Sequence, residues 1–121
     1  MTFDAFAFDE RIGAGIRAAG YVTPTPIQQQ SIPLVLQGSD VLGLAQTGTG
    51  KTAAFALPLL QKLIQVRAAR QGTIRVLVLA PTRELALQIH ESFIDLGRQT
   101  GYRSAVAYGG VGKYPQVKAL K

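Results

Sequence analysis

The sequence predicts an α/β fold in which an open parallel sheet carries helices on both faces. Short apolar runs alternate along the chain with segments of helical period. A glycine-rich turn joins the first apolar run to the helix after it. The order strand, helix, strand, helix, strand implies right-handed crossovers between parallel strands. With 121 residues, 47% of them hydrophobic, the chain is large enough to bury the core of one domain.

The first predicted helix covers 9–19. Asp9 is a residue type that caps helix starts, and Ile12 and Ile16 fall on one face at helical spacing. Gly20 then favours a stop.

A second helix is predicted directly after two closely spaced prolines. Thr25 takes the cap position, Pro26 the first helical position and Gln28 the third, which is a capping-box pattern. We expect this helix to falter at Pro33 and to end by Gly38.

The first strand and the helix after it flank the glycine-rich turn. Residues 41–45 are a short apolar run typical of a buried strand. A long helix is predicted over 50–66. Pro58 inside it removes one backbone hydrogen bond and clashes with the carbonyl of Ala54, so a kink is expected there.

The second and third strands are predicted at 74–80 and 104–108. The former is apolar except for Arg75 and rich in branched residues, as expected of a parallel strand covered on both faces. Between them Thr82 can cap a helix that stops near Gly101. Its apolar stripe is Leu85, Ile89, Phe93 and Leu96.

The composition limits the classes of function. Without cysteine the chain forms no disulfide or thiolate metal site, and its single histidine, His90, is expected at a helix surface or core edge. The N-terminus lacks a secretion signal and no apolar run is long enough to span a membrane, so a cytoplasmic protein without a membrane partner is predicted. The net charge of +6 favours polyanionic partners such as nucleic acid, and all charged residues after Asp95 are basic.

The turn after the first strand is a candidate phosphate site. Its sequence matches the Walker A pattern except at the first position, where alanine replaces glycine. Two glycines let backbone amides face phosphate oxygens, and the helix start adds partial positive charge. Lys51 would reach the β and γ phosphates, and the Thr52 hydroxyl would hold Mg²⁺. The alternative is a glycine-rich loop with an exposed lysine. The candidate nucleotide-binding residues here are Ala45, Gln46, Thr47, Gly48, Thr49, Gly50, Lys51 and Thr52.

The segment 20–28 is the candidate for base selection. The amide of Gln28 can pair with adenine in bidentate fashion, which guanine does not allow. Tyr21 or Phe3 could stack on the base. The alternative is that Gln28 only completes the capping box with Thr25.

Together these residues resemble the DEAD-box RNA helicases. Phe3 followed by 20–28 resembles the Q motif of that family, and 45–52 resembles its motif I, in which alanine is usual at the first position. Residues 81–86 resemble motif Ia, and Gly109 with Gly110 resembles the glycine pair that follows. The tail 108–116 is similar to the bacterial RhlE-like branch.

The resemblance implies an RNA contact at the carboxyl end of the second strand. Pro81, Thr82 and Arg83 would meet RNA phosphates, and Gly109 and Gly110 would allow close backbone approach to the RNA. An arginine beside the free amides of a helix start is a reasonable anion site. The alternative for Arg83 is a surface ion pair with a nearby glutamate, either Glu84 or Glu91.

The resemblance also implies domain organisation and activity. Residues 1–38 would be a Q-motif region, and 39–121 the first part of a RecA-like P-loop domain. The family's Asp-Glu-Ala-Asp and Ser-Ala-Thr motifs are absent from these residues, so the chain alone is expected to be inactive in hydrolysis. The parent would be an RNA-dependent ATPase that unwinds short RNA duplexes or remodels RNA–protein complexes, using ATP and Mg²⁺ and contacting RNA backbone with little sequence preference.

Two other classes of function are possible. A P-loop kinase or other NTPase would share the phosphate loop but would not need the segment around Gln28. A non-catalytic RNA-binding module would suit the basic tail but would leave the phosphate loop unexplained.

Overall fold

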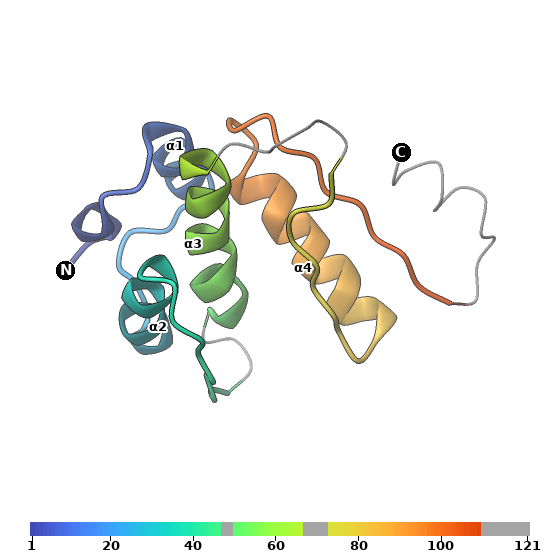
Figure 1. Cartoon of the computed structure of the whole chain (residues 1–121). Coiled ribbons are helices and arrows are strands. Elements are labelled where there is room, and N and C mark those ends of the chain that lie inside the picture. The colour runs from blue at the N-terminus through green and yellow to red at the C-terminus, as the bar shows by residue number, and fades with distance from the viewer. Residues whose placement is uncertain (47–49, 67–72, 110–121) are drawn as a thin grey trace.

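The computed structural model describes residues 1–46, 50–66 and 73–109. A short 3-10 helix that the sequence did not predict, η1 (Phe3–Phe6), precedes four α-helices in these residues: α1 (Glu10–Ala18), α2 (Pro26–Leu36), α3 (Lys51–Gln65) and α4 (Arg83–Leu96). Helix α3 lies between α2 on one side and α4 on the other, and α1 packs against both α3 and α4 (Figure 1). None of the helices in the described ranges is long and apolar enough to cross a membrane.

The core forms where these helices meet around α3. Its buried apolar side chains come from η1 and all four helices: Phe3, Ile12, Ile16, Ile32, Ala53, Ala56, Leu57, Leu60 and Leu96.

Helix α1 confirms its predicted signals. The Asp9 carboxylate accepts a hydrogen bond from the backbone N–H of Arg11 at 2.9 Å, and Ile12 and Ile16 are buried. The chain leaves the helix at Gly20, whose φ is +79°. A side chain at Gly15 would overlap the backbone of Leu96, so this glycine allows the close approach of α1 to α4.

Helix α2 starts at Pro26 and ends before Gly38, as predicted, but it continues through Pro33 to Leu36. The prediction that it falters at Pro33 is wrong. A proline inside a helix removes one hydrogen bond locally, whereas α2 packs closely along α3 with Ile32 fully buried between them. Tertiary packing therefore outweighs the local disruption.

Helix α3 begins directly after the glycine-rich turn. Gly50 is its N-cap with φ +82°, and Pro58 lies fully buried inside the helix. The kink expected at Pro58 stays a prediction.

Helix α4 is capped as predicted, because the Thr82 hydroxyl accepts from the Leu85 N–H at 3.1 Å. Of its apolar stripe, Ile89 and Leu96 are buried. The helix ends at Leu96 rather than near Gly101. Gly97 follows as the C-cap, and a side chain there would press on Leu60, so this glycine permits the close approach of the helix end to α3.

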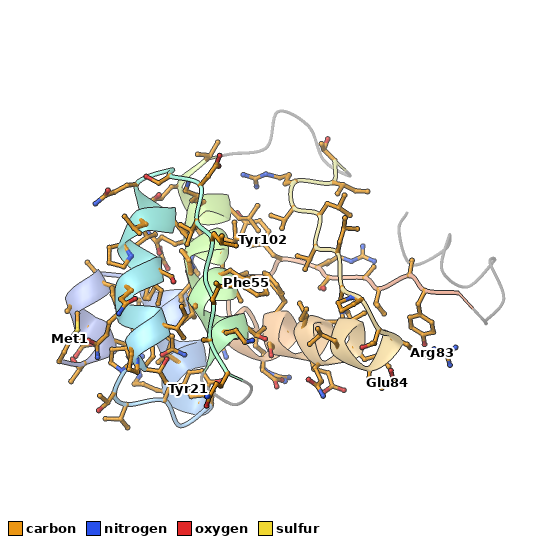
Figure 2. The ribbon with its side chains drawn as sticks, turned by 90° about the horizontal axis from the view of Figure 1, so that it is seen from below. Met1, Tyr21, Phe55, Arg83, Glu84 and Tyr102 are labelled. Carbon is orange, nitrogen blue, oxygen red and sulfur yellow. The ribbon has the colours of Figure 1, made fainter. Side chains whose placement is uncertain are left out.

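The predicted strands are not formed within the described residues. The segments 41–45, 74–80 and 104–108 run as irregular chain and share no ladder of backbone hydrogen bonds. Strand formation requires a neighbouring strand. In Figure 2, however, 41–46 lies beside α2 and α3, whereas 73–80 lies on the side of α4. Their apolar side chains are largely exposed, including Leu42 at 88% and Leu79 at 84%.

Candidate functional site

A pocket of about 430 Å³ opens where the segment 20–28 meets the start of α3. Phe3, Tyr21, Gln28 and Gly50 all line it. The structure thus brings the three candidate base-binding residues to the point where the phosphate loop enters its helix, although Phe3 and the segment 20–28 are separate parts of the chain.

The two aromatic candidates stack on one another. The ring centroids of Phe3 and Tyr21 lie 6.1 Å apart, with an interplanar angle of 26°. Phe3 is only 6% exposed, whereas Tyr21 is 41% exposed. Tyr21 is therefore the ring that is accessible to a ligand, and Phe3 supports it from the core.

Gln28 is buried and makes two hydrogen bonds across the pocket. Its Oε1 accepts from the Thr25 backbone N–H at 2.9 Å, and its Nε2 donates to the Gly50 carbonyl at 3.1 Å. A primary amide can accept two hydrogen bonds and donate two. Helix capping thus leaves hydrogen-bonding capacity on both polar atoms, although the side chain is only 3% exposed.

Glycine is strongly favoured at position 50. A side chain there would overlap Nε2 of Gln28, and the φ of +82° is left-handed. Lys51 and Thr52 follow as the first two residues of α3, exposed and half-buried respectively. Lys51 has no ion pair among the described residues, so its ammonium is available beside the partial positive charge of the helix start.

The remainder of the phosphate loop is only partly described. Ala45 is half-buried and Gln46 exposed. Thr47, Gly48 and Thr49 lie outside the described residues, as does the part of the 108–116 tail from Gly110 onwards.

A divalent cation has one candidate ligand here. Within the described ranges no cluster of three or more histidine or acidic side chains could hold a metal ion. The half-buried hydroxyl of Thr52 at the start of α3 fits Mg²⁺ that is held mainly by nucleotide phosphates and water.

The candidate RNA-contacting residues meet at the start of α4. Pro81, Thr82 and Arg83 are exposed. The Nη2 of Arg83 donates to the Gly109 carbonyl at 3.2 Å, and its Cζ lies 5.1 Å from the centre of the Tyr108 ring. Figure 2 shows Arg83 at the end of the molecule away from Tyr21, so this corner is separate from the pocket.

The alternative role for Arg83 is not observed in the described residues. No ion pair joins it to Glu84 or Glu91 there, since the arginines that pair with carboxylates are Arg11, Arg17 and Arg98. The guanidinium keeps its positive charge beside the amides of the helix start.

No sequence pattern indicated the contacts of Tyr108, or those that Tyr102 and Arg75 make with the C-terminal end of α3. The Tyr102 hydroxyl donates to the Leu63 carbonyl at 2.5 Å, and Arg75 donates to the carbonyls of Leu63 and Val66. Arg75 also lies 6.0 Å from the centre of the Tyr102 ring. These side chains satisfy carbonyls that the helix end leaves unpaired. Tyr108 could have been suspected as an aromatic residue directly before a glycine pair.

His90 holds α4 to the chain that follows it. Its Nδ1 lies 2.8 Å from the Ser104 hydroxyl oxygen, and the side chain is half-buried. The expectation of a core-edge residue is confirmed.

Comparison with known proteins places this geometry in a family context. The family model described as DEAD/DEAH box helicase matches residues 25–121. The chain is 48% identical over 121 residues to the DEAD-box ATP-dependent RNA helicase CshA of Streptococcus pneumoniae, and 50% identical over 119 residues to the ATP-dependent rRNA helicase rrp3 of Aspergillus niger. These alignments cover 100% and 98% of the chain, but only 22% and 25% of the relatives' own length.

A solved structure of an RNA helicase is also similar to this chain. The RNA helicase Prp28 from Chaetomium thermophilum, bound to ADP, superimposes with a TM-score of 0.87 at 37% identity. The match covers 98% of this chain and 29% of that one.

Proposed function

This chain belongs to the DEAD/DEAH box helicase family, and from that membership we propose that it supplies the ATP-binding and RNA-binding N-terminal part of an ATP-dependent RNA helicase. The whole protein would use ATP hydrolysis to unwind short RNA duplexes or to remodel RNA–protein complexes in the cytoplasm. The names of CshA and rrp3, both ATP-dependent RNA or rRNA helicases, support this activity.

The nucleotide pocket is the observation that carries the proposal. In it Tyr21 offers a ring face and Gln28 an amide edge to adenine, next to the start of α3. Lys51 would bind the β and γ phosphates and Thr52 would coordinate Mg²⁺, which supplies charge neutralisation when bound. The ADP bound to Prp28 supports an adenine nucleotide as the ligand.

The RNA contact is proposed for the corner at the start of α4. Arg83, Thr82 and Pro81 would face RNA phosphates. Gly109 and Gly110 would let the RNA strand approach the protein backbone closely. Backbone contacts of this kind carry little sequence information.

We further propose that the exposed apolar segments 41–45, 74–80 and 104–108 are strand positions of a RecA-like open parallel sheet, with 1–38 as the preceding Q-motif region and 39–121 as the first part of the sheet domain. The unbroken apolar run Leu77, Val78 and Leu79 supports this assignment, because strands of a parallel sheet are covered on both faces and so lack the polar alternation of a half-exposed strand.

The two alternative classes explain less. A kinase or another P-loop NTPase leaves the pocket contacts of Gln28 without a role, and the family match disfavours it. A purely RNA-binding module leaves the pocket itself unexplained.

The two binding roles can be separated in one experiment on the 121-residue chain. Lys51→Ala is expected to weaken ADP binding by about tenfold or more, since it removes a charge-assisted phosphate contact, and to leave RNA binding nearly unchanged. Arg83→Ala is expected to weaken binding of a short oligouridylate, to lower the salt slope by about 0.7 for one single-strand phosphate, and to spare ADP.

Charge-matched controls come from the opposite ends of the same helices. Lys62→Ala lies in the last turn of α3, and Arg98→Ala lies just beyond α4. Neither is expected to change its ligand's affinity by more than a general charge effect. If Lys51→Ala and Lys62→Ala behaved alike towards ADP, the phosphate site would be misplaced. An equal result for the two arginine variants with RNA would remove the RNA corner.

A further inference from the structure

The structure adds Tyr108 to the corner around Arg83. The guanidinium carbon of Arg83 lies 5.1 Å from the centre of the Tyr108 ring, well within the range of a cation–π contact. The same guanidinium donates to the carbonyl of the next residue, Gly109, at 3.2 Å. Tyr108 and Gly109 thus both contact the side chain of Arg83, which lies 26 positions before Gly109 in the sequence.

We propose that Tyr108 is a positioning residue that holds the Arg83 guanidinium ready for an RNA phosphate. This inference rests on the proposed RNA contact of Arg83 and specifies how that contact is prepared.

The chemistry of the two contacts suits such a role. A guanidinium carries five N–H donors, and a ring contact uses its charge and flat face without consuming any of them. The Gly109 carbonyl takes one donor. The remaining donors can form the two parallel bonds that an arginine makes with a phosphate. A carboxylate partner would instead neutralise the charge, and none pairs with Arg83 in the described part of the chain.

The contact with Tyr108 restricts the Arg83 side chain before RNA binds. Arg83 is exposed, so without a support its long side chain would sample many rotamers and lose that freedom on binding RNA. Tyr108 is half-buried and therefore a firmer support than a fully exposed ring. Thr82 fixes the backbone beside Arg83 by capping α4.

The test is a double-mutant cycle in the 121-residue chain, with oligouridylate affinity measured at several salt concentrations. Tyr108→Leu is expected to weaken binding by about two- to fivefold, the range of an exposed cation–π contact. Tyr108→Phe keeps the ring and is expected to bind like the unaltered chain. In an Arg83→Ala background, Tyr108→Leu is expected to have no further effect, because the side chain it positions is gone.

Three other results would overturn either the positioning role of Tyr108 or the RNA contact of Arg83. If Tyr108→Leu weakens binding equally in both backgrounds, Tyr108 contacts RNA directly and the positioning role is overturned. If Tyr108→Phe binds as weakly as Tyr108→Leu, the ring contact is not the cause and the inference is again wrong. If Arg83→Ala itself leaves RNA affinity unchanged, the proposed function of Arg83 fails, independently of Tyr108. Unchanged ADP affinity in every variant verifies that the chain has kept its fold.

Discussion

The side-chain amide nitrogen of Gln28 donates a hydrogen bond to the backbone carbonyl of Gly50 at 3.1 Å. Gln28 belongs to the first turn of α2, and Gly50 is the residue from which α3 starts. The contact joins the proposed base-reading segment to the end of the proposed phosphate loop. Because a side chain on Gly50 would overlap the amide, the two positions constrain one another.

Gln28→Glu is expected to reduce the preference for ADP over GDP. The glutamate keeps an oxygen for the Thr25 N–H but loses the donor to Gly50 and to adenine. A bidentate base contact is worth about 1–3 kcal/mol, so the ratio of the two dissociation constants is expected to fall by about tenfold. Calorimetry gives the ratio, and circular dichroism reports whether α2 is intact. Gln30→Glu, an exposed neighbour with the same charge change, is the control. Undiminished selectivity in Gln28→Glu would make this residue a helix cap only.

Gly50→Ala and Gly101→Ala separate backbone strain from steric overlap. Both glycines have left-handed backbones, with φ of +82° and +77°, but only Gly50 has an atom in the way of a side chain. Gly101→Ala is expected to lower the free energy of unfolding by about 1–2 kcal/mol, the cost of the left-handed conformation. Gly50→Ala should cost more than that and should also weaken ADP binding, as seen by urea unfolding and titration. Equal losses would show that the contact with Gln28 is loose.

Asp9 is expected to make part of the stability depend on acid pH. The side-chain hydrogen bond from Arg11, aided by that from its backbone N–H, holds the pKa of Asp9 below its ordinary value of 3.8. A carboxylate with a lowered folded-state pKa stabilises the fold above its unfolded value and loses that contribution as pH falls through the folded value. Asp9→Asn keeps a capping oxygen, so its deficit relative to the unaltered chain should be present at neutral pH and vanish at a pH well below the folded-state pKa of Asp9. Urea unfolding at both pH values measures it, and a deficit independent of pH would exclude the ionic contact.

Tyr102→Phe is expected to lower the free energy of unfolding by about 0.5–1.5 kcal/mol, since it removes the hydrogen bond to the Leu63 carbonyl. ADP and RNA affinities should stay unchanged, because the contact lies at the end of α3 opposite to the nucleotide pocket. Thermal or urea unfolding gives the first value. Unaltered stability would mean that water replaces the hydroxyl without cost.

The features that the sequence predicted well are those governed by neighbouring residues. The caps at Asp9 and Thr82 follow local rules, and both are formed. The passage of α2 through Pro33 could not be predicted locally, because it depends on burial of Ile32 against α3. Strands depend on partners that lie far away in the sequence, and local apolar runs identify candidates for them but not their pairing.

In the candidate site too, local patterns could be predicted but contacts between distant segments could not. The sequence pattern identified Phe3, Tyr21, Gln28 and Gly50 one segment at a time, and the fold unites them in one pocket. The contact of Arg83 with Tyr108 leaves no periodic signal, since nothing in the pattern of either segment specifies the other. Such ring and carbonyl contacts emerge only when the chain is folded.

Calorimetric titration of the folded chain with ADP and, in parallel, with GDP in the presence of Mg²⁺ tests whether the chain holds an adenine-selective nucleotide pocket. We expect ADP to bind, and GDP to bind more weakly by about tenfold or more. Equal affinities for the two nucleotides, or no binding of ADP by a chain whose helices are formed, would show that the chain holds no such pocket.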